Sequence, residues 1–390
     1  MTTKVMFCLL AAGSLALDAA ANCAETRLKA LIDSGELPGA VTIFKNDGRE
    51  ERTCLGWADV EKKVPMREDT LFMVCSQTKG VCGAACAILI DDGKVQLDDP
   101  IEKYLPEFKD LRVRVTNTNG TEALVAPAEK LTLRHCLTHT GGFPYEGPVL
   151  KTYGWAAAPL RIRATVNAAV PLVRHPGVRY CYSNTGIDIA GAVVEQVSGM
   201  KFDEFLESRL FKPLGMNETW FDPPPEALQR LATNYRLIPG KRAEPYPVHY
   251  TRRFDEKERR WPCPSAGLYS TPRDFVKFYE MIMNKGVGAN GVRVLKAETV
   301  TEILGKKQTP AAVGANYSLG LNVGGGWIGH SGALQTYCEV NPEKRQLRMW
   351  MVQLRGEAGG YIVKSDVIDA IRKAGADFTA LRDDRTRSGQ

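Results

Sequence analysis

The chain has 390 residues, 44% of them hydrophobic, and its 51 basic and 45 acidic residues give a net charge of +6. This length and apolar content are enough for a large buried core, in one big domain or in two lobes that share a cleft. The basic residues form no continuous block, which argues against a nucleic-acid partner and favours a mixed, solvated surface. We therefore expect a globular protein with no nucleic-acid partner.

The first segment of the chain is short and apolar. Residues 5–17 are almost all apolar or small after a single Lys4, and Asp18-Ala19-Ala20-Ala21 follows. This pattern is typical of a signal peptide with a small-residue cleavage site, and it is too short for a stable membrane span. We expect residues 1–24 to be a signal peptide, with export to the periplasm or the extracellular space. The alternative is an N-terminal helix that packs on the domain.

The chain contains ten cysteines, and their setting bears on the same question. No C-x-x-C pair is present, so a zinc or redox framework is not expected. Several cysteines lie in apolar or motif-bearing segments, where free cysteine behaves as a small buried hydrophobe: Cys75, Cys82, Cys86, Cys136 and Cys181. Free thiols fit a reducing compartment, so a cytoplasmic location stays open as the alternative to export.

After that segment the pattern predicts a helix followed by a β-hairpin. Residues 25–34 form a helical pattern stopped by Gly35, and residues 40–44 read as a strand. A turn at Asn46-Asp47-Gly48 then leads to a returning strand over residues 52–57.

Residues 76–79 read Ser-Gln-Thr-Lys, a spacing that can pair a nucleophile with its activator. A lysine that has lost its proton in a desolvated pocket can take the hydroxyl proton of a serine during attack. The small, apolar run 80–90 predicts a buried helix, which would place Ser76 and Lys79 on one face. Backbone N–H groups at the helix start favour developing negative charge. Because such a motif occurs by chance about once in a chain of this length, partners elsewhere are required.

The rest of the chain predicts a helical insert and a return to the sheet. Residues 98–306 are rich in helical pattern and Pro/Gly loops, and strand signals return after them. Strands at both ends with helices between them suggest one antiparallel sheet closed by distant segments. The expected domain at 25–381 comprises an α/β lobe (25–97 and 307–381), a helical lobe (98–306), strands at 317–321, 334–340 and 347–352, and a last helix at 362–381, before a polar tail at 382–390.

Two further motifs could supply partners for Ser76. Tyr182 and Asn184 lie on a loop before a helix expected at residues 187–197. A phenol can relay a proton beside a cation, and an amide can pair with both a carbonyl and an N–H of an acyl substrate. Near the end of the chain, residues 329–333 read Gly-His-Ser-Gly-Ala just before a strand, where glycine allows a ligand to approach the backbone closely.

Together these motifs resemble the serine β-lactamase and penicillin-binding protein superfamily. The resemblance rests on the order of the motifs S-x-x-K, Y-S-N and H-S-G. Within the superfamily, the chain resembles the branch that includes D-alanyl-D-alanine carboxypeptidases and β-lactamase-like esterases. It extends over residues 25–355 and includes further blocks in order: Leu37-Pro38-Gly39-Ala40, Leu97-Asp98-Asp99-Pro100, Tyr104-Leu105-Pro106, 131–142, Pro213-Leu214-Gly215-Met216 and 266–274. It implies an α+β fold in which an antiparallel sheet is flanked by helices and carries a mostly helical inserted lobe.

The resemblance also implies catalytic roles. Ser76 would be the acylated nucleophile, and Lys79 and Tyr182 would transfer protons. The backbone N–H of Ser76 would supply one donor of the oxyanion hole. The chemistry implied is an acyl-enzyme released by water or another acceptor, with no metal and no cofactor.

The remaining roles implied by the resemblance concern substrate binding. Asn184 would orient the substrate, and Ala333 would supply the second oxyanion donor from its N–H. His330, Ser331 and Gly332 would line the far wall of the cleft. Many relatives have a lysine at the position of His330, and histidine is charged only part of the time near neutral pH.

This departure favours an ester, an amide or a D-peptide over a β-lactam as the small-molecule substrate. A glycine that often follows the late motif is absent, and residues 333–337 read Ala-Leu-Gln-Thr-Tyr, which puts bulk near the acyl pocket. The expected function is a serine hydrolase of the carboxylesterase or D-alanyl-D-alanine carboxypeptidase type. The alternatives are a β-lactamase and a non-catalytic penicillin-binding or sensor protein, and no oligomeric state is indicated.

Two other patterns compete with this interpretation. Residues 329–333 nearly match the G-x-S-x-G elbow of α/β-hydrolases, with Ser331 as nucleophile, but that elbow needs a helix after it. His135 and His139 are four apart, as in a metal-binding pair on a helix, but no glutamate lies between them and the resembled family uses this turn structurally. We expect no metal site.

Overall fold

The computed structural model describes residues 23–148, 158–246, 260–356 and 365–381. The expected signal peptide, except for its last two residues, and the polar tail at 382–390 lie outside the described residues, so export remains a proposal. In the described part of the chain, no helix is long and apolar enough to cross a membrane. Each cysteine of that part has a free thiol.

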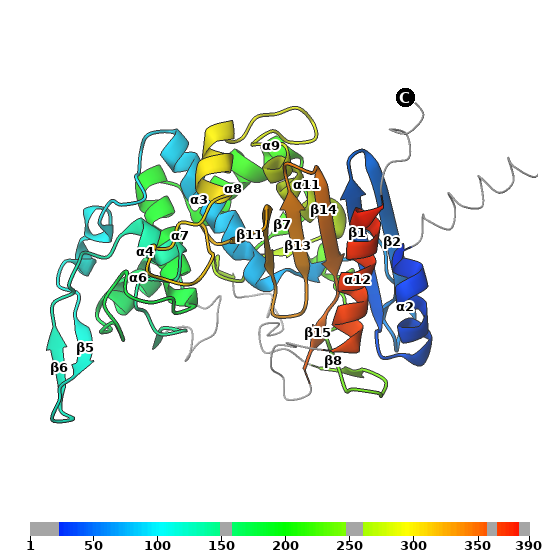
Figure 1. Cartoon of the computed structure of the whole chain (residues 1–390), viewed down its shortest axis with the longest axis horizontal. Coiled ribbons are helices and arrows are strands. Elements are labelled where there is room, and N and C mark those ends of the chain that lie inside the picture. Colours follow the sequence, from blue (N-terminus) through cyan, green and yellow to red (C-terminus); the bar gives the residue numbers. More distant parts are fainter. Residues whose placement is uncertain (1–22, 149–157, 247–259, 357–364, 382–390) are drawn as a thin grey trace, which may run out of the picture.

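A seven-stranded antiparallel sheet forms one side of the molecule (Figure 1), in the order β11-β12-β13-β14-β1-β2-β3. The early hairpin joins the late strands because Val41 of β1 pairs with Met351 of β14. This confirms the expected α+β fold, with a sheet closed by distant segments. The strands are β1 (Gly39–Asn46), β2 (Arg49–Asp59), β3 (Val64–Pro65), β11 (Asn322–Gly324), β12 (Trp327–Ser331), β13 (Tyr337–Asn341) and β14 (Gln346–Met351).

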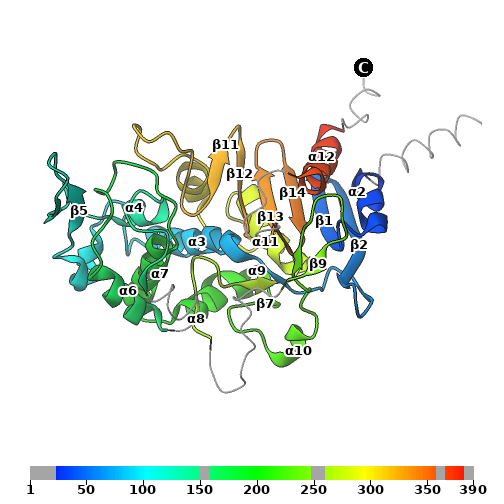
Figure 2. The same ribbon diagram turned by 90° about the horizontal axis from the view of Figure 1, so that it is seen from below.

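Different helices cover the two faces of this sheet, and the side chains of β1 alternate between these two faces. Val41 and Ile43 point into the main core, whereas Ala40 and Phe44 belong to a second apolar cluster. Successive side chains of a strand point to opposite faces, so a strand covered on both sides needs apolar residues at both parities. Helices α2 (Cys23–Ser34) and α12 (Asp366–Ala380) cover one face, and α11 (Pro272–Met283) covers the other (Figure 2).

The other side of the molecule is mostly helical, and α3 (Thr78–Asp91) runs through it. As predicted from its small apolar residues, α3 is buried from Thr78 to Leu89. The lobe boundaries inferred from the sequence remain a proposal, and α11, which lies within residues 98–306, packs against the sheet. The other α-helices of the described residues are α4 (Leu133–Leu137), α6 (Leu160–Ala168), α7 (Asn184–Ser198), α8 (Phe202–Leu206), α9 (Lys212–Leu214) and α10 (Pro225–Leu228).

Short strands complete the described structure in three small sheets. These are β4 (Phe72–Met73), β10 (Tyr269–Ser270) and β7 (Thr219–Trp220); β15 (Leu354–Arg355), β8 (Tyr235–Arg236) and β9 (Glu244–Pro245); and β5 (Val113–Thr116) with β6 (Glu122–Val125). The first of them matters for function, because β4 leads directly into the S-x-x-K segment.

Two of the predicted strands differ from the structure. Residues 317–321 are not a strand, because Gly320 has a φ of 70° and lies so close to α3 that a Cβ there would be 2.1 Å from the Lys79 carbonyl oxygen. The strand predicted over residues 334–340 begins only at Tyr337. A tight turn precedes it, in which the Gly332 N–H donates to the Thr336 carbonyl (2.7 Å) and Gln335 has a φ of 64°.

Candidate active site

Ser76 lies on a one-turn 3₁₀ helix, η1 (Cys75–Gln77), immediately before α3. It is partly exposed between buried neighbours, as a nucleophile must be. Cys75 has a φ of 50°, a conformation that L-residues rarely adopt and that tertiary contacts must support. A local hydrogen bond also holds this turn, because the Thr78 hydroxyl donates to the Cys75 carbonyl at 2.6 Å. The α-helix therefore begins two residues after the serine, and the turn before it orients Ser76.

Lys79 is completely buried, and its Nζ contacts three oxygen atoms. Ser76 Oγ lies at 3.0 Å, Asn184 Oδ1 at 2.8 Å and the Ser265 carbonyl oxygen at 2.7 Å. The amide and carbonyl oxygens can only accept hydrogen bonds, so they take two N–H groups of the lysine. In a neutral amine the remaining lone pair then points at the Ser76 hydroxyl.

The protonation of Lys79 is set by its surroundings. Burial lowers the pKa of Lys79 to about 7, although the negative charge of Asp188 acts in the opposite direction. A substantial fraction of the amine is therefore neutral near pH 7, in the form that can accept a proton from Ser76.

Tyr182 packs beside this amine, just before α7. Lys79 Nζ lies 4.7 Å from the centroid of the Tyr182 ring. The centroids of the His139 and Tyr182 rings are 4.3 Å apart. The next residue, Ser183, caps α7 by accepting a hydrogen bond from the Gly186 N–H at 3.4 Å. This cap places Tyr182 and Asn184 on either side of it, so that both lie against Lys79.

A chain of hydrogen bonds runs behind Tyr182 from one loop to the late strand. The Ser183 N–H donates to Nδ1 of His139 (3.1 Å), whose Nε2 lies 3.1 Å from the Tyr317 hydroxyl. That hydroxyl lies 2.9 Å from Nε2 of His330, whose Nδ1 lies 2.6 Å from the Ser331 carbonyl. A backbone donor at one end and a backbone acceptor at the other allow one continuous direction of donation, in which both imidazoles are neutral.

Burial reinforces the neutral state of both imidazoles. It lowers the pKa of His330 to about 3 and that of His139 well below its ordinary value, and the neighbouring Lys79 charge acts in the same direction. His330 lies near Tyr182, with ring centroids 6.3 Å apart, where the sequence places a substrate-binding residue. Any contribution of His330 to substrate binding is therefore made without a charge, and that role remains a proposal.

Gly332 brings the turn after β12 against the segment that precedes Ser76. A Cβ at this position would lie 2.4 Å from the Val74 carbonyl oxygen and 2.1 Å from Thr336 Oγ1. The Thr336 hydroxyl itself donates to that carbonyl at 3.0 Å. Ala333, the next residue, packs against the cluster that contains Cys75. The structure thus brings together the two segments whose N–H groups were expected to form the oxyanion hole.

The competing motifs are arranged differently. Ser331 lies at the end of β12 and the strand β13 follows, so the strand–turn–helix that a G-x-S-x-G elbow requires is absent at this position. His135 lies in α4 and its Nδ1 accepts from the Thr132 N–H at 3.2 Å. His139 lies outside that helix with a φ of 60°. Within the described ranges, no group of three or more potential ligands could hold a metal ion.

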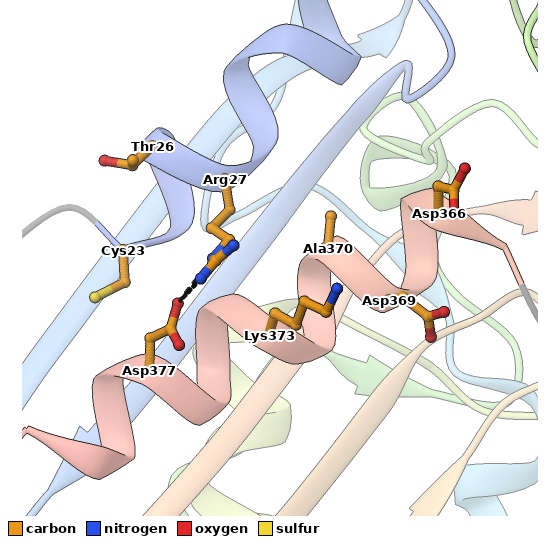
Figure 3. A pocket seen from close by; sticks show the side chains of 8 residues that line it. All are labelled: Cys23, Thr26, Arg27, Asp366, Asp369, Ala370, Lys373 and Asp377. Carbon is orange, nitrogen blue, oxygen red and sulfur yellow. Dashed lines mark hydrogen bonds and ion pairs between the residues drawn. The ribbon is translucent and has the colours of Figure 1, made fainter.

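An open pocket of about 460 Å³ lies elsewhere, between α2 and α12 (Figure 3). One ion pair crosses it, from Arg27 to Asp377 at 2.6 Å. Burial raises the pKa of the Cys23 thiol at its edge, which disfavours the thiolate form. Its lining comes from the two helices on the outer face of the sheet, so this pocket is not part of the Ser76 site.

Sequence reasoning missed two groups at the Ser76 site. Ser265 contributes only its backbone carbonyl, which every residue type possesses, so no sequence signal marked it. Tyr317 was assigned to a strand, and one of its two partners, His139, is 178 residues away in the sequence. The placements of Ser76, Lys79, Tyr182 and Asn184 agree with the order of motifs, but their catalytic roles remain proposals.

Comparison with known proteins places this geometry in context. A family model described as Beta-lactamase matches residues 24–372. Esterase EstB of Burkholderia gladioli is 31% identical over 301 residues, covering 69% of this chain and 72% of the esterase. Protein Rv1367c of Mycobacterium tuberculosis is 29% identical over 373 residues, covering 84% of this chain and 89% of that protein. Among solved structures, EstCE1, a hydrolase with promiscuous acyltransferase activity, superposes with a TM-score of 0.73 at 22% identity, covering 93% of this chain and 99% of its own.

Proposed function

The chain belongs to the beta-lactamase family, and we propose that it is a serine hydrolase that forms an acyl-enzyme on Ser76. The acyl donor is an ester or amide, as for a carboxylesterase or a D-alanyl-D-alanine carboxypeptidase. The observation that carries this proposal is the set of three oxygens around Lys79 Nζ, at 3.0, 2.8 and 2.7 Å. Two of them can only accept hydrogen bonds, which leaves the amine lone pair for the hydroxyl proton of Ser76.

The acylation step follows from this arrangement. Ser76 Oγ attacks the acyl carbonyl while its proton passes to Lys79 Nζ, and the carbonyl π electrons move onto the oxygen. The N–H groups of Ser76 and Ala333 bind that oxyanion, which typically contributes a factor of about 10²–10³ per donor. The lysine, now an ammonium, lies 4.7 Å from the Tyr182 ring centroid and gains a cation–π contact.

Collapse of the tetrahedral intermediate expels the leaving group. Tyr182 delivers a proton to it, and Lys79 replaces the proton that Tyr182 gives up. Water then attacks the acyl-enzyme and returns Ser76. Asn184 orients the substrate through its amide nitrogen, because its oxygen is already bound to Lys79.

The state of His330 bears on the choice of substrate. Many relatives have a lysine here, whereas in this chain the pKa of His330 is lowered to about 3 by burial. A substrate carboxylate gains no ion pair from this position. This favours an uncharged ester or amide over the two candidate substrates that carry a carboxylate, a β-lactam and a D-alanyl-D-alanine peptide.

A second candidate is acyl transfer to an alcohol, and it shares the same acyl-enzyme. Acyltransferase calJ of Penicillium decumbens is 27% identical to this chain over 269 residues. The two reactions differ only in whether water or an alcohol attacks the acyl group on Ser76.

Labelling with a fluorophosphonate, read out by mass spectrometry of peptides, tests the nucleophile. We expect the adduct on the Ser76 peptide and its loss in Ser76→Ala. Ser331→Ala is the matched comparison, because Ser331 is the rival serine, and the adduct should still form on the Ser76 peptide in that variant. Labelling of another serine, or labelling that survives in Ser76→Ala, contradicts the proposal.

A substrate panel then separates the reaction types. A p-nitrophenyl ester, a D-alanyl-D-alanine peptide and a cephalosporin are compared, each with and without an added alcohol. Faster release of the acyl group with an alcohol identifies acyl transfer. Labelling of Ser76 without turnover of any of the three supports a non-catalytic penicillin-binding or sensor protein instead.

A further inference from the structure

A buried ion pair lies next to the Ser76 site. Arg163 of α6 is fully buried and Asp188 of α7 is 2% exposed. Arg163 Nη1 lies 3.3 Å from Asp188 Oδ2. Burying two charges carries a large desolvation cost, and such a pair is therefore weak evidence for stability by itself. Its hydrogen bonds show what it holds in place.

Both members of the pair bind the segment 262–265. Arg163 Nη2 donates to the Pro262 carbonyl at 2.5 Å, and the Ser265 N–H donates to Asp188 Oδ1 at 3.1 Å. The carbonyl of the same Ser265 accepts from Lys79 Nζ at 2.7 Å. The ion pair is thus two hydrogen bonds away from the amine that faces Ser76, and it fixes the segment at both ends.

Charge links the pair to Lys79 as well. The negative charge of Asp188 favours the protonated amine, and the adjacent Arg163 offsets that charge. Glu146 lies farther along, with Oε1 3.5 Å from Nδ2 of Asn184. Among the described residues, Asp188 is connected to Lys79 by hydrogen bonds through Ser265, and Glu146 is connected to it through Asn184.

Five titratable groups around Lys79, three thiols and two imidazoles, are uncharged near neutral pH. Burial raises the pKa of the thiols of Cys75, Cys82 and Cys263. Burial also keeps His139 and His330 neutral, as described above. A change of charge at Asp188 or Arg163 therefore reaches Lys79 through a region that holds few other charges, where screening by solvent is weak.

We infer that Arg163 and Asp188 are positioning residues, which hold the Ser265 carbonyl so that the Lys79 lone pair faces Ser76 and which set the pH at which that lone pair becomes available. This inference rests on the proposed role of Lys79 as the base. It assigns a function to two residues that lie outside the S-x-x-K, Y-S-N and H-S-G motifs.

The two residues can be tested separately because their charges are opposite. The readout is the rate of Ser76 labelling by a fluorophosphonate as a function of pH, which needs no turnover. In Asp188→Asn an oxygen remains to accept from the Ser265 N–H but the charge is lost. The acidic limb of this profile, where the labelling rate rises with pH, should then move to lower pH. In Arg163→Gln the uncompensated Asp188 should move it to higher pH. Each shift is expected to be on the order of one pH unit.

Three further variants make the test sharp. Asp188→Asn combined with Arg163→Gln should bring the limb back close to that of the wild type. Arg163→Lys keeps the positive charge but loses the two separate nitrogens that contact Asp188 and the Pro262 carbonyl. The maximal labelling rate should therefore fall about tenfold, while the acidic limb of the pH profile stays in place. Glu339→Gln is the control, since Glu339 pairs with Arg348 at 3.3 Å on the sheet, and it should change neither quantity.

The outcomes distinguish this inference from the proposed function. Unshifted limbs in both single variants, or shifts in the same direction, overturn the inference while leaving Ser76 as the nucleophile. If Arg163→Gln does not fold, Asp188→Asn and Arg163→Lys still decide, because a purely structural role predicts no shift for the first and no loss of rate for the second. Absence of Ser76 labelling in the wild type refutes the proposed function instead.

Discussion

The hydroxyl of Tyr317 lies 2.9 Å from Nε2 of His330 and 3.1 Å from Nε2 of His139, so one phenol joins two buried imidazoles. Through them it ties the late strand β12 to the loop that carries Tyr182. The network of Tyr317, His139 and His330 beside the Ser76 site is therefore polar, hydrogen-bonded at each ring nitrogen and uncharged. Such a network keeps its geometry only while every member has its partner.

Replacing Tyr317 with phenylalanine should break this network. His330 loses its donor and His139 loses its acceptor, and an unpaired buried polar group costs about 1–3 kcal/mol. We expect a lower free energy of unfolding in urea and slower hydrolysis of a p-nitrophenyl ester. Tyr180→Phe is the matched control, because that ring packs 5.8 Å from Tyr317 in the same cluster. Equal stability of the two variants would show that the hydroxyl of Tyr317 contributes nothing.

The neutral state of His330 predicts how stability depends on pH. Its pKa is lowered from 6.5 to about 3, so between these values the unfolded chain takes up a proton and the folded chain does not. Stability is therefore lost as the pH falls through this window. In His330→Gln that contribution is absent, and the unfolding free energy should fall less steeply from pH 7 to pH 4. A slope in His330→Gln as steep as that of the wild type would contradict the neutral assignment.

How far the sequence could predict this site depends on what each residue contributes. The run of small apolar residues after Ser76 predicted a buried helix, and α3 is buried from Thr78 to Leu89. Alternating and β-branched segments predicted the hairpin of β1 and β2 within a few residues. In these cases local pattern and tertiary environment agree, which is where sequence reasoning works well.

The parts that were missed depend on contacts between distant segments. The Ser265 carbonyl is a backbone group and leaves no mark on residue identity. The strand assigned to residues 317–321 failed because Gly320 packs onto α3, where a Cβ would meet the Lys79 carbonyl oxygen at 2.1 Å. The positive φ of Cys75 follows from the turn that presents Ser76, not from any preference of cysteine.

The lowered pKa of Lys79 predicts the pH dependence of the reaction. Only the neutral amine accepts the Ser76 proton, and its pKa is about 7, so kcat/KM should rise with pH and level off above a limb near that value. Lys79→Ala should lose a factor of about 10²–10⁴ in kcat and retain a wild-type circular dichroism spectrum. Lys94→Ala, at an exposed loop position, is the control and should leave both the rate and the limb unchanged. A pH-independent rate between pH 5 and 9 would exclude Lys79 as the titrating base.

Gly332 tests whether the turn after β12 supplies the second oxyanion donor. In Gly332→Ala the new methyl group would lie 2.4 Å from the Val74 carbonyl oxygen, a backbone atom that cannot rotate away. The turn must shift, and the Ala333 N–H shifts with it relative to Ser76. We expect kcat to fall by about 10²–10³, the typical effect of removing one oxyanion donor, with a smaller change in KM.

The matched control for this variant is Gly324→Ala, in the neighbouring strand β11, where an added Cβ has no atom within 4 Å. That variant should retain the wild-type kcat. Thermal unfolding of both variants separates a local shift of the turn from a general loss of structure. A kcat of Gly332→Ala equal to that of Gly324→Ala would mean that the oxyanion is bound without Ala333. The second oxyanion donor would then be one of the other N–H groups around η1, where the positive φ of Cys75 sets the backbone direction just before Ser76.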